Sequence, residues 1–294
     1  MAYANNGPVR VHYQRMAAGN GPVVILLAGA GRPSTDFDYG FCAPIVTAGL
    51  VPIRIDSRDT GHSTAMTGTT PDLHAIKAAA LDTGDARPPY GISDMAADVL
   101  AVMDAEGVMA AHFVGRSIGG LVAQQLAVRH PERVLSLALV MAMSRSMADA
   151  VPDAALDRLM AENVPDEDAY VARQLAVAQV NGMAEDFDAE RIAEEARTAW
   201  RHGIHPGGTA RHFAASLAAP DLRAVIRAIR VPALILHGRH DKVIPLERAF
   251  ETAEAIPGAV IEVDETMGHD GPPRLRHAWG ERISAHLTAA MAHA

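Results

Sequence analysis

The sequence predicts an α/β protein with a mostly parallel central sheet, flanking helices and an inserted helical cap. In the first half, short apolar runs rich in β-branched residues alternate with helical patterns, which is typical of parallel strands joined by crossover helices. Several runs are continuously apolar, as expected for strands covered on both faces. Between about residues 143 and 226 the strand pattern stops and helical segments take over.

Seven segments are predicted as strands, each an apolar run bounded by turn or polar residues. They are residues 9–15, 23–28, 52–56, 112–115, 135–140, 233–237 and 260–263.

Helices are predicted where apolar residues recur at helical spacing. In 93–106 a Ser cap precedes Met95, Val99 and Val102, and a second helix is expected over 118–130. The cap segments begin at Asp or Pro-Asp positions, in agreement with their periodicity. They cover residues 153–163, 166–180, 189–202 and 209–217.

This pattern divides the chain into two domains. Residues 1–142 and 227–294 form the core, and residues 143–226 form the helical cap, or lid. Residues 64–89 are a Gly-, Thr- and Pro-rich excursion with one short helix expected over 73–81. The role of that excursion is open.

Composition excludes several classes of protein. The net charge of −9, with scattered basic residues, argues against a nucleic-acid groove. No apolar run reaches the roughly 18 residues of a membrane helix, and the first residues lack the features of a secretory signal. We therefore expect a cytoplasmic protein with no membrane partner. Cys42 is the only cysteine, so no internal disulfide or cysteine metal cluster is expected.

The sharpest local motif surrounds Ser117. An apolar strand runs into Gly115-Arg116-Ser117-Ile118-Gly119 and then into a helix, which is the pattern of a nucleophile elbow. Small residues are needed on both sides, because the serine occupies a strained turn against neighbouring elements. The alternative is a serine that simply begins a helix.

A serine nucleophile needs a base and a carboxylate, which follow it in the order Asp or Glu, then His. Asp241 comes just after the strand at 233–237 and before a Pro-started helical stretch, and it is the candidate acid. His269 lies in the loop after the last strand and is the candidate base.

Backbone N–H groups must also stabilise the oxyanion of acyl transfer. Ile118, directly after the serine, and Ala30, in the Gly29-Ala30-Gly31 turn, are the candidate donors. The same turn, with Asp56 after the next strand, could belong to a dinucleotide-binding loop. Against that reading, Ser34 occupies the usual place of the third glycine and Pro33 interrupts the expected helix.

Two histidines near the candidate acid have the spacing of metal ligands. His237 and His240 flank the candidate acid at a spacing that metal ligands use, but no third and fourth ligands stand nearby in the sequence. We expect no metal and no cofactor.

With these motifs, the chain resembles the α/β-hydrolase superfamily over nearly its whole length. It most resembles the aclacinomycin methylesterase-like carboxylesterases, through IRIDSRDTGHST, PYGISDMAADVLAVMDAEGV and RSIGGLVAQQLAVRHPERV. The resemblance implies that Ser117, Asp241 and His269 form the triad, that Ala30 and Ile118 are the oxyanion donors, and that no cofactor is used. It also favours a structural role for the turn at Asp56–Asp59, in which Arg58 braces neighbouring loops. Ala28 departs from the family, where many members have His before the oxyanion glycine.

The expected function is hydrolysis of a small to medium, mainly apolar ester through an acyl-enzyme, with a methyl ester among the candidates. The same triad would also suit carbon-carbon bond hydrolases, amidases, lactonases and acyltransferases. A ligand-binding protein that keeps the fold without turnover is the alternative from another class. The expected partner is a small-molecule ester, and a homo-oligomer is left open.

Overall fold

The computed structural model describes residues 1–160, 164–205 and 207–292, and it contains one sheet of eight strands in the order β1-β2-β4-β3-β5-β6-β7-β8. Strands β3 to β8 run parallel to one another, whereas β1 with β2 and β2 with β4 pair antiparallel. The bounds are β1 Ala2–Asn6, β2 Val9–Arg15, β3 Val23–Leu27, β4 Val51–Ile55, β5 Ala111–Arg116, β6 Val134–Val140, β7 Ala233–Gly238 and β8 Val260–Asp264.

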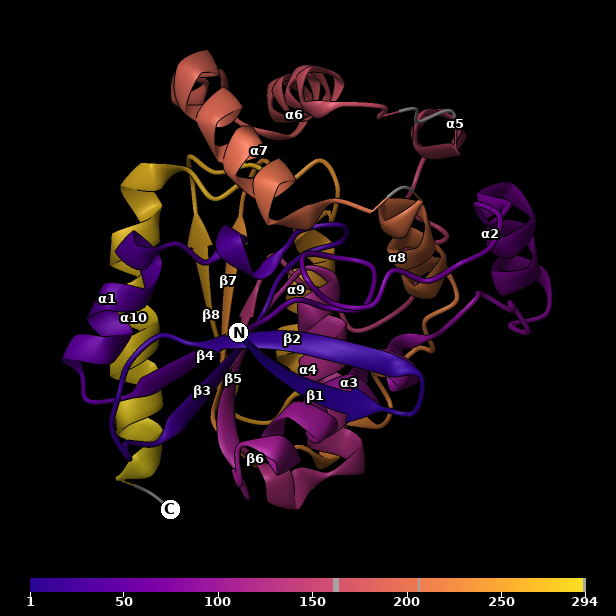
Figure 1. The fold of residues 1–294 in the computed structure, drawn as a ribbon. Coiled ribbons are helices and arrows are strands. Elements are labelled where there is room, and N and C mark those ends of the chain that lie inside the picture. Colours follow the sequence, from indigo (N-terminus) through magenta and orange to yellow (C-terminus); the bar gives the residue numbers. More distant parts are fainter. Residues whose placement is uncertain (161–163, 206, 293–294) are drawn as a thin grey trace.

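All seven predicted strands are confirmed within one residue at each end, and β1 is an additional edge strand. The helices, which Figure 1 shows arranged around the sheet, are α1 Tyr39–Thr47, α2 Leu73–Asp82, α3 Ile92–Ala105, α4 Ile118–Arg129, α5 Asp153–Met160, α6 Glu167–Asn181, α7 Ala189–Gly203, α8 Gly208–Leu217, α9 Leu246–Ala255 and α10 Pro273–Met291. The predicted helix over 153–163 ends at Met160 among described residues, and its last three positions lie outside them.

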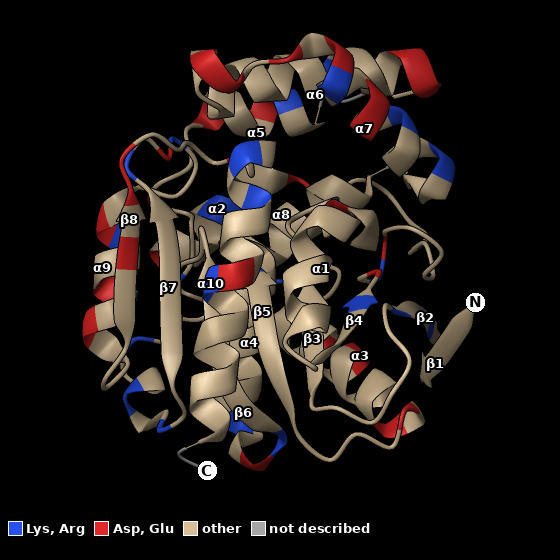
Figure 2. Ribbon diagram, turned by 90° about the vertical axis from the view of Figure 1, so that its left-hand side faces the viewer, with Lys and Arg blue, Asp and Glu red and all other residues tan. Residues whose placement is uncertain are grey.

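Two apolar layers cover the two faces of the sheet. Alternate strand residues such as Ile25 and Phe113 face α3 and α4, whereas Val24 and Val114 face α1 and α10. Strands β3 and β7 contain no charged residue, and Figure 2 shows charged residues mainly on the helices, the loops and the edge strand β8. This two-sided burial explains why the central strands are continuously apolar.

The segment between β6 and β7 contains α5 to α8. Figures 1 and 2 show α6 and α7 above the carboxyl ends of the parallel strands, apart from the layers that cover the sheet faces. This inserted segment has a small apolar cluster of its own, in which Tyr170 packs against Trp200 with ring centroids 5.8 Å apart. In the parts of the chain that the structure describes, every helix is too short or too polar to cross a membrane.

Candidate active site

Ser117 occupies a strained turn between a buried strand and a helix. It follows β5 directly, precedes the first residue of α4, and has φ 52° and ψ −119°. A non-glycine residue in such a conformation costs of order 1–3 kcal/mol and persists only where the surrounding structure imposes it. The strand-to-helix turn that the sequence predicts is therefore present.

Close packing explains the glycines on both sides of this turn. A Cβ atom on Gly119 would lie 2.2 Å from the carbonyl oxygen of Leu27, and one on Gly115 would lie 2.4 Å from the carbonyl oxygen of Gly119. Both neighbours are backbone atoms, so neither contact is relieved by rotating a side chain. The elbow thus lies directly against the end of β3, where the candidate oxyanion loop begins.

Asp241 and His269 contact each other directly. They follow the neighbouring strands β7 and β8, and Nδ1 of His269 lies 2.7 Å from Oδ2 of Asp241. The other carboxylate oxygen, Oδ1, accepts hydrogen bonds from the backbone N–H groups of Val243 and Ile244 at 2.9 and 2.7 Å. The carboxylate is held in place, and Nε2 of His269 remains for a further partner.

The carboxyl of Asp241 is poised to be ionised. Burial alone raises its pKa, but the charge of His269 and the hydrogen bond from its ring outweigh burial, so the pKa lies below the usual value of 3.8. A carboxylate in this state fixes the tautomer of the imidazole that it contacts and stabilises the imidazolium.

Ser117 lies at the same sheet edge as this pair, because β5 and β7 are parallel and only β6 separates them. The loop that carries His269 also reaches the elbow, since a Cβ on Gly271 would lie 3.5 Å from Nη1 of Arg116, the residue before Ser117. The Ser117 hydroxyl itself has no hydrogen bond to His269 or to another described residue. Catalytic hydrogen bonds are often long without substrate and tighten when it binds.

The candidate oxyanion loop lies beside Ser117. A Cβ built on Gly29 would be 3.7 Å from the Cβ of Ser117. Within the described chain, the backbone N–H groups of Ala30 and Ile118 have no hydrogen-bond acceptor, whereas the N–H of Gly31 donates to Nδ1 of His212 at 3.0 Å. The two N–H groups selected from the sequence are thus available to a ligand.

Several residues around the site were not identified from the sequence. Arg116 donates to Asp36 at 2.7 Å, and the N–H of His269 donates to the carbonyl of Asn181, at the end of α6. His212, on α8, contacts the candidate oxyanion loop. These partners lie far apart along the chain, so local sequence patterns carry no signal for them.

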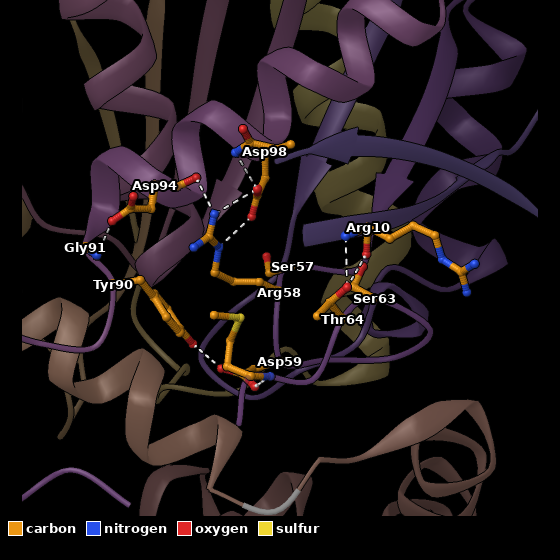
Figure 3. Close-up of polar contacts among 12 residues, drawn as sticks. Arg10, Ser57, Arg58, Asp59, Ser63, Thr64, Tyr90, Gly91, Asp94 and Asp98 are labelled. Atoms are coloured by element: carbon orange, nitrogen blue, oxygen red, sulfur yellow. Dashed lines mark hydrogen bonds and ion pairs between the residues drawn. The ribbon is translucent and has the colours of Figure 1, made fainter. Parts of the chain in front are cut away.

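Arg58 has a structural role, as expected, but it braces the turn against a helix rather than against neighbouring loops. Its guanidinium donates to both carboxylate oxygens of Asp98, at 2.7 and 2.8 Å, and to the carbonyl of Asp94 at 3.0 Å, as Figure 3 shows. Both partners belong to α3, so Arg58 fixes the turn after β4 to that helix.

Two groups of side chains have the chemistry of metal ligands. His237 is buried and donates from Nε2 to the carbonyl oxygen of Ile244 at 2.9 Å, whereas His240 is exposed, so these two histidines do not form one metal site. His12, Asp56 and His202 present ligand-type atoms within 4.8 Å of one another. The nitrogens of both histidines already lie 2.7 and 2.8 Å from Oδ2 of Asp56, so hydrogen bonds satisfy the group and join α7 to the sheet.

Known proteins share this architecture. Residues 22–271 match the family described as alpha/beta hydrolase fold. This chain belongs to that family. Its resemblance to methylesterases is confirmed as well, because rhodomycin D methylesterase DnrP from Streptomyces peucetius is 29% identical over 288 residues, covering 91% of each chain.

Other similar proteins differ in their activities. RutD from Variovorax paradoxus, assigned as a carbamate hydrolase, is 32% identical and covers 88% of this chain and 89% of its own. The crystal structure of the enol-lactonase from Burkholderia xenovorans LB400 superposes with a TM-score of 0.76 at 27% identity, covering 98% of this chain and all of the enol-lactonase. The chain is therefore a member of a hydrolase family that includes esterases.

Proposed function

We propose that this protein is a serine carboxylesterase in which Ser117 is the nucleophile, His269 the general base and Asp241 the residue that orients the base. The observation that carries the proposal is the 2.7 Å contact between Asp241 and His269 at the sheet edge where the strained turn presents Ser117. A serine hydroxyl is a weak nucleophile until such a base removes its proton.

The reaction proceeds in two halves. His269 takes the proton of the Ser117 hydroxyl as its Oγ attacks the ester carbonyl carbon, and the negative oxygen is stabilised by the N–H groups of Ala30 and Ile118. The tetrahedral intermediate collapses to an acyl-enzyme when His269 returns the proton to the departing alcohol. Water then attacks the acyl carbonyl carbon and loses a proton to His269, and the carboxylic acid leaves when His269 returns that proton to the Ser117 Oγ.

The inserted segment, residues 143–226, acts as a cap over this site. Support comes from the backbone contact between His269 and Asn181 and from the tight approach of Gly268, whose Cβ would lie 2.2 Å from the Asn181 carbonyl oxygen. The end of α6 thus rests on the loop that carries the proposed base. We expect a small to medium, mainly apolar ester, with methyl esters among the candidates, and no cofactor.

A substrate screen tests the proposal. Purified protein is assayed against p-nitrophenyl esters of increasing chain length and against methyl esters, with Ser117→Ala as the matched control. Turnover of short or medium esters by the wild type, and none by the variant, is the expected result. Equal hydrolysis by both proteins would refute the role of Ser117, and a folded wild type inactive on every ester would favour another acyl substrate or a ligand-binding role.

A further inference from the structure

We propose that His212 is a positioning residue that holds the oxyanion loop in its working geometry; this inference rests on the proposed function. His212 belongs to α8 in the inserted segment, 181 residues after the loop that it contacts. Its Nδ1 lies 3.0 Å from the backbone nitrogen of Gly31, the residue next to the proposed oxyanion donor Ala30.

The hydrogen bonds of His212 require one tautomer of the neutral ring. Because a backbone N–H only donates, Nδ1 must be unprotonated to accept from Gly31. Nε2 then carries the proton and donates to the carbonyl oxygen of Arg58 at 2.8 Å. The side chain is fully buried, and burial lowers its pKa, which favours this neutral form. His212 thus accepts a hydrogen bond from the oxyanion loop and donates one to the turn after β4, so it links the two segments.

The turn on the far side of this bridge is itself rigid. The Arg58 side chain is fixed to α3, and Asp59 accepts from the hydroxyl of Tyr90 at 2.7 Å (Figure 3) and from the guanidinium of Arg211 at 2.8 Å on each oxygen. Since Arg211 precedes His212 on α8, two neighbouring residues of one helix bind two neighbouring residues of one turn. The carbonyl that accepts from the His212 imidazole therefore belongs to a turn that is held in place by several hydrogen bonds.

The same helix also packs tightly against the oxyanion loop. Gly31 has φ +67°, and a Cβ at this position would lie 2.2 Å from Oγ1 of Thr209, one turn before His212 on α8. The peptide between Ala30 and Gly31 is thus confined by packing on one side and oriented by the hydrogen bond to His212. Without the Nδ1 acceptor of His212, the peptide that carries the Gly31 N–H can rotate. The adjacent Ala30 N–H would then move away from the position of the oxyanion.

Displacement of an oxyanion donor affects the chemical step more than substrate binding. Loss of one donor in other enzymes lowers kcat by roughly 100-fold to 1000-fold, and a misplacement of about 1 Å costs about 100-fold. We therefore expect His212→Phe, which fills the space without an acceptor, to lower kcat by about 10-fold to 100-fold with KM changed less than about threefold. His212→Asn places an amide oxygen near the position of Nδ1 and should retain more of kcat than His212→Phe.

The matched control is His112→Asn. His112 is also fully buried, but its Nδ1 bonds the Ser136 hydroxyl between β5 and β6 and does not contact the oxyanion loop. This control should lose stability while keeping kcat close to that of the wild type. The second readout is inhibition by a phenylboronic acid, which forms a tetrahedral adduct with an active serine: its Ki should rise in His212→Phe by the same factor as kcat/KM falls.

The outcomes separate this inference from the proposed function. If His212→Phe loses no more kcat than His112→Asn at a comparable fall in Tm, or if its boronate Ki matches that of the wild type, the positioning role is overturned. If the wild type itself lacks esterase activity and does not bind the boronate, the proposed function fails and this inference fails with it. A wild type that is active, with His212→Asn and His212→Phe equally impaired, would contradict the role of the Gly31 hydrogen bond.

Discussion

Nδ1 of His269 lies 2.7 Å from Oδ2 of Asp241, and the second oxygen of that carboxylate is held by two backbone N–H groups. This arrangement fixes the position of the imidazole and leaves its Nε2 for a further partner, which is Ser117 in the proposed triad. It arises because parallel strands end at one edge of the sheet, so that side chains from separate loops meet there.

The first prediction concerns this pair. Asp241→Asn keeps the shape of the side chain but offers an amide in place of the carboxylate, which favours the wrong tautomer of His269 and no longer stabilises the imidazolium. In serine proteases the corresponding change lowers kcat by about 10,000-fold. We expect a fall of about 1000-fold or more in steady-state hydrolysis of a p-nitrophenyl ester. The control is Asp264→Asn, because the Asp264 carboxylate accepts hydrogen bonds only from Thr266 among the residues that the structure describes. A kcat for Asp241→Asn within tenfold of the wild type would contradict the assigned role.

The second prediction concerns strain at Ser117. Because glycine adopts a φ of 52° without the steric cost that other residues have, Ser117→Gly should be more stable than Ser117→Ala by about 1 kcal/mol, although both are inactive. Urea unfolding of the two variants measures this difference. Equal stability, or a less stable glycine variant, would show that the turn stores no strain.

Sequence patterns predict the features of this fold that depend on neighbouring residues. The seven strands, the elbow at Ser117 and the placement of Asp241 and His269 after late strands all follow from runs and spacings of a few residues. Helix α1 was not predicted, because Gly40 and Pro44 interrupt its sequence, and its capping residue Asp38 becomes clear only from the hydrogen bond to Phe41.

The elements and contacts that the sequence does not predict depend on residues far apart in the chain or on weak local patterns. Helix α10 buries Trp279, Ile283 and Leu287 at intervals of four, a helical signal that Gly280 and many polar residues dilute. The edge strand β1 is short and polar, and only its pairing with β2 defines it. The bond between Gly31 and His212 joins residues whose proximity depends on how the inserted segment packs, which no local pattern encodes.

The third prediction concerns the pH dependence of stability at Asp56. Burial raises the pKa of this carboxyl, but hydrogen bonds from His12 and His202 and the charge of His202 outweigh burial and hold the pKa well below its usual range. A carboxyl whose pKa is lower in the folded state stabilises the protein above the unfolded pKa of about 3.9, and that stability is lost as the pH falls further. Asp56→Asn removes this contribution.

We therefore expect the Tm of the wild type to fall more steeply than that of Asp56→Asn as the pH is lowered from 5 to 3, even though the variant is less stable at pH 7. Thermal unfolding followed by circular dichroism across this range makes the comparison, in which the other carboxyl groups are common to both proteins. Parallel curves for the two proteins would show that Asp56 does not supply the pH dependence assigned to it.

The most direct test of the account is whether Ser117 is an activated nucleophile. The folded protein is incubated with a fluorophosphonate, digested, and mapped by mass spectrometry, with His269→Ala treated in parallel. We predict a single covalent adduct on the peptide that contains Ser117, and much slower labelling when His269 is replaced by Ala. A folded wild-type protein that carries no adduct at Ser117 would contradict the assignment of Ser117 as the nucleophile. Labelling of His269→Ala as fast as that of the wild type would contradict the role of His269 as the base.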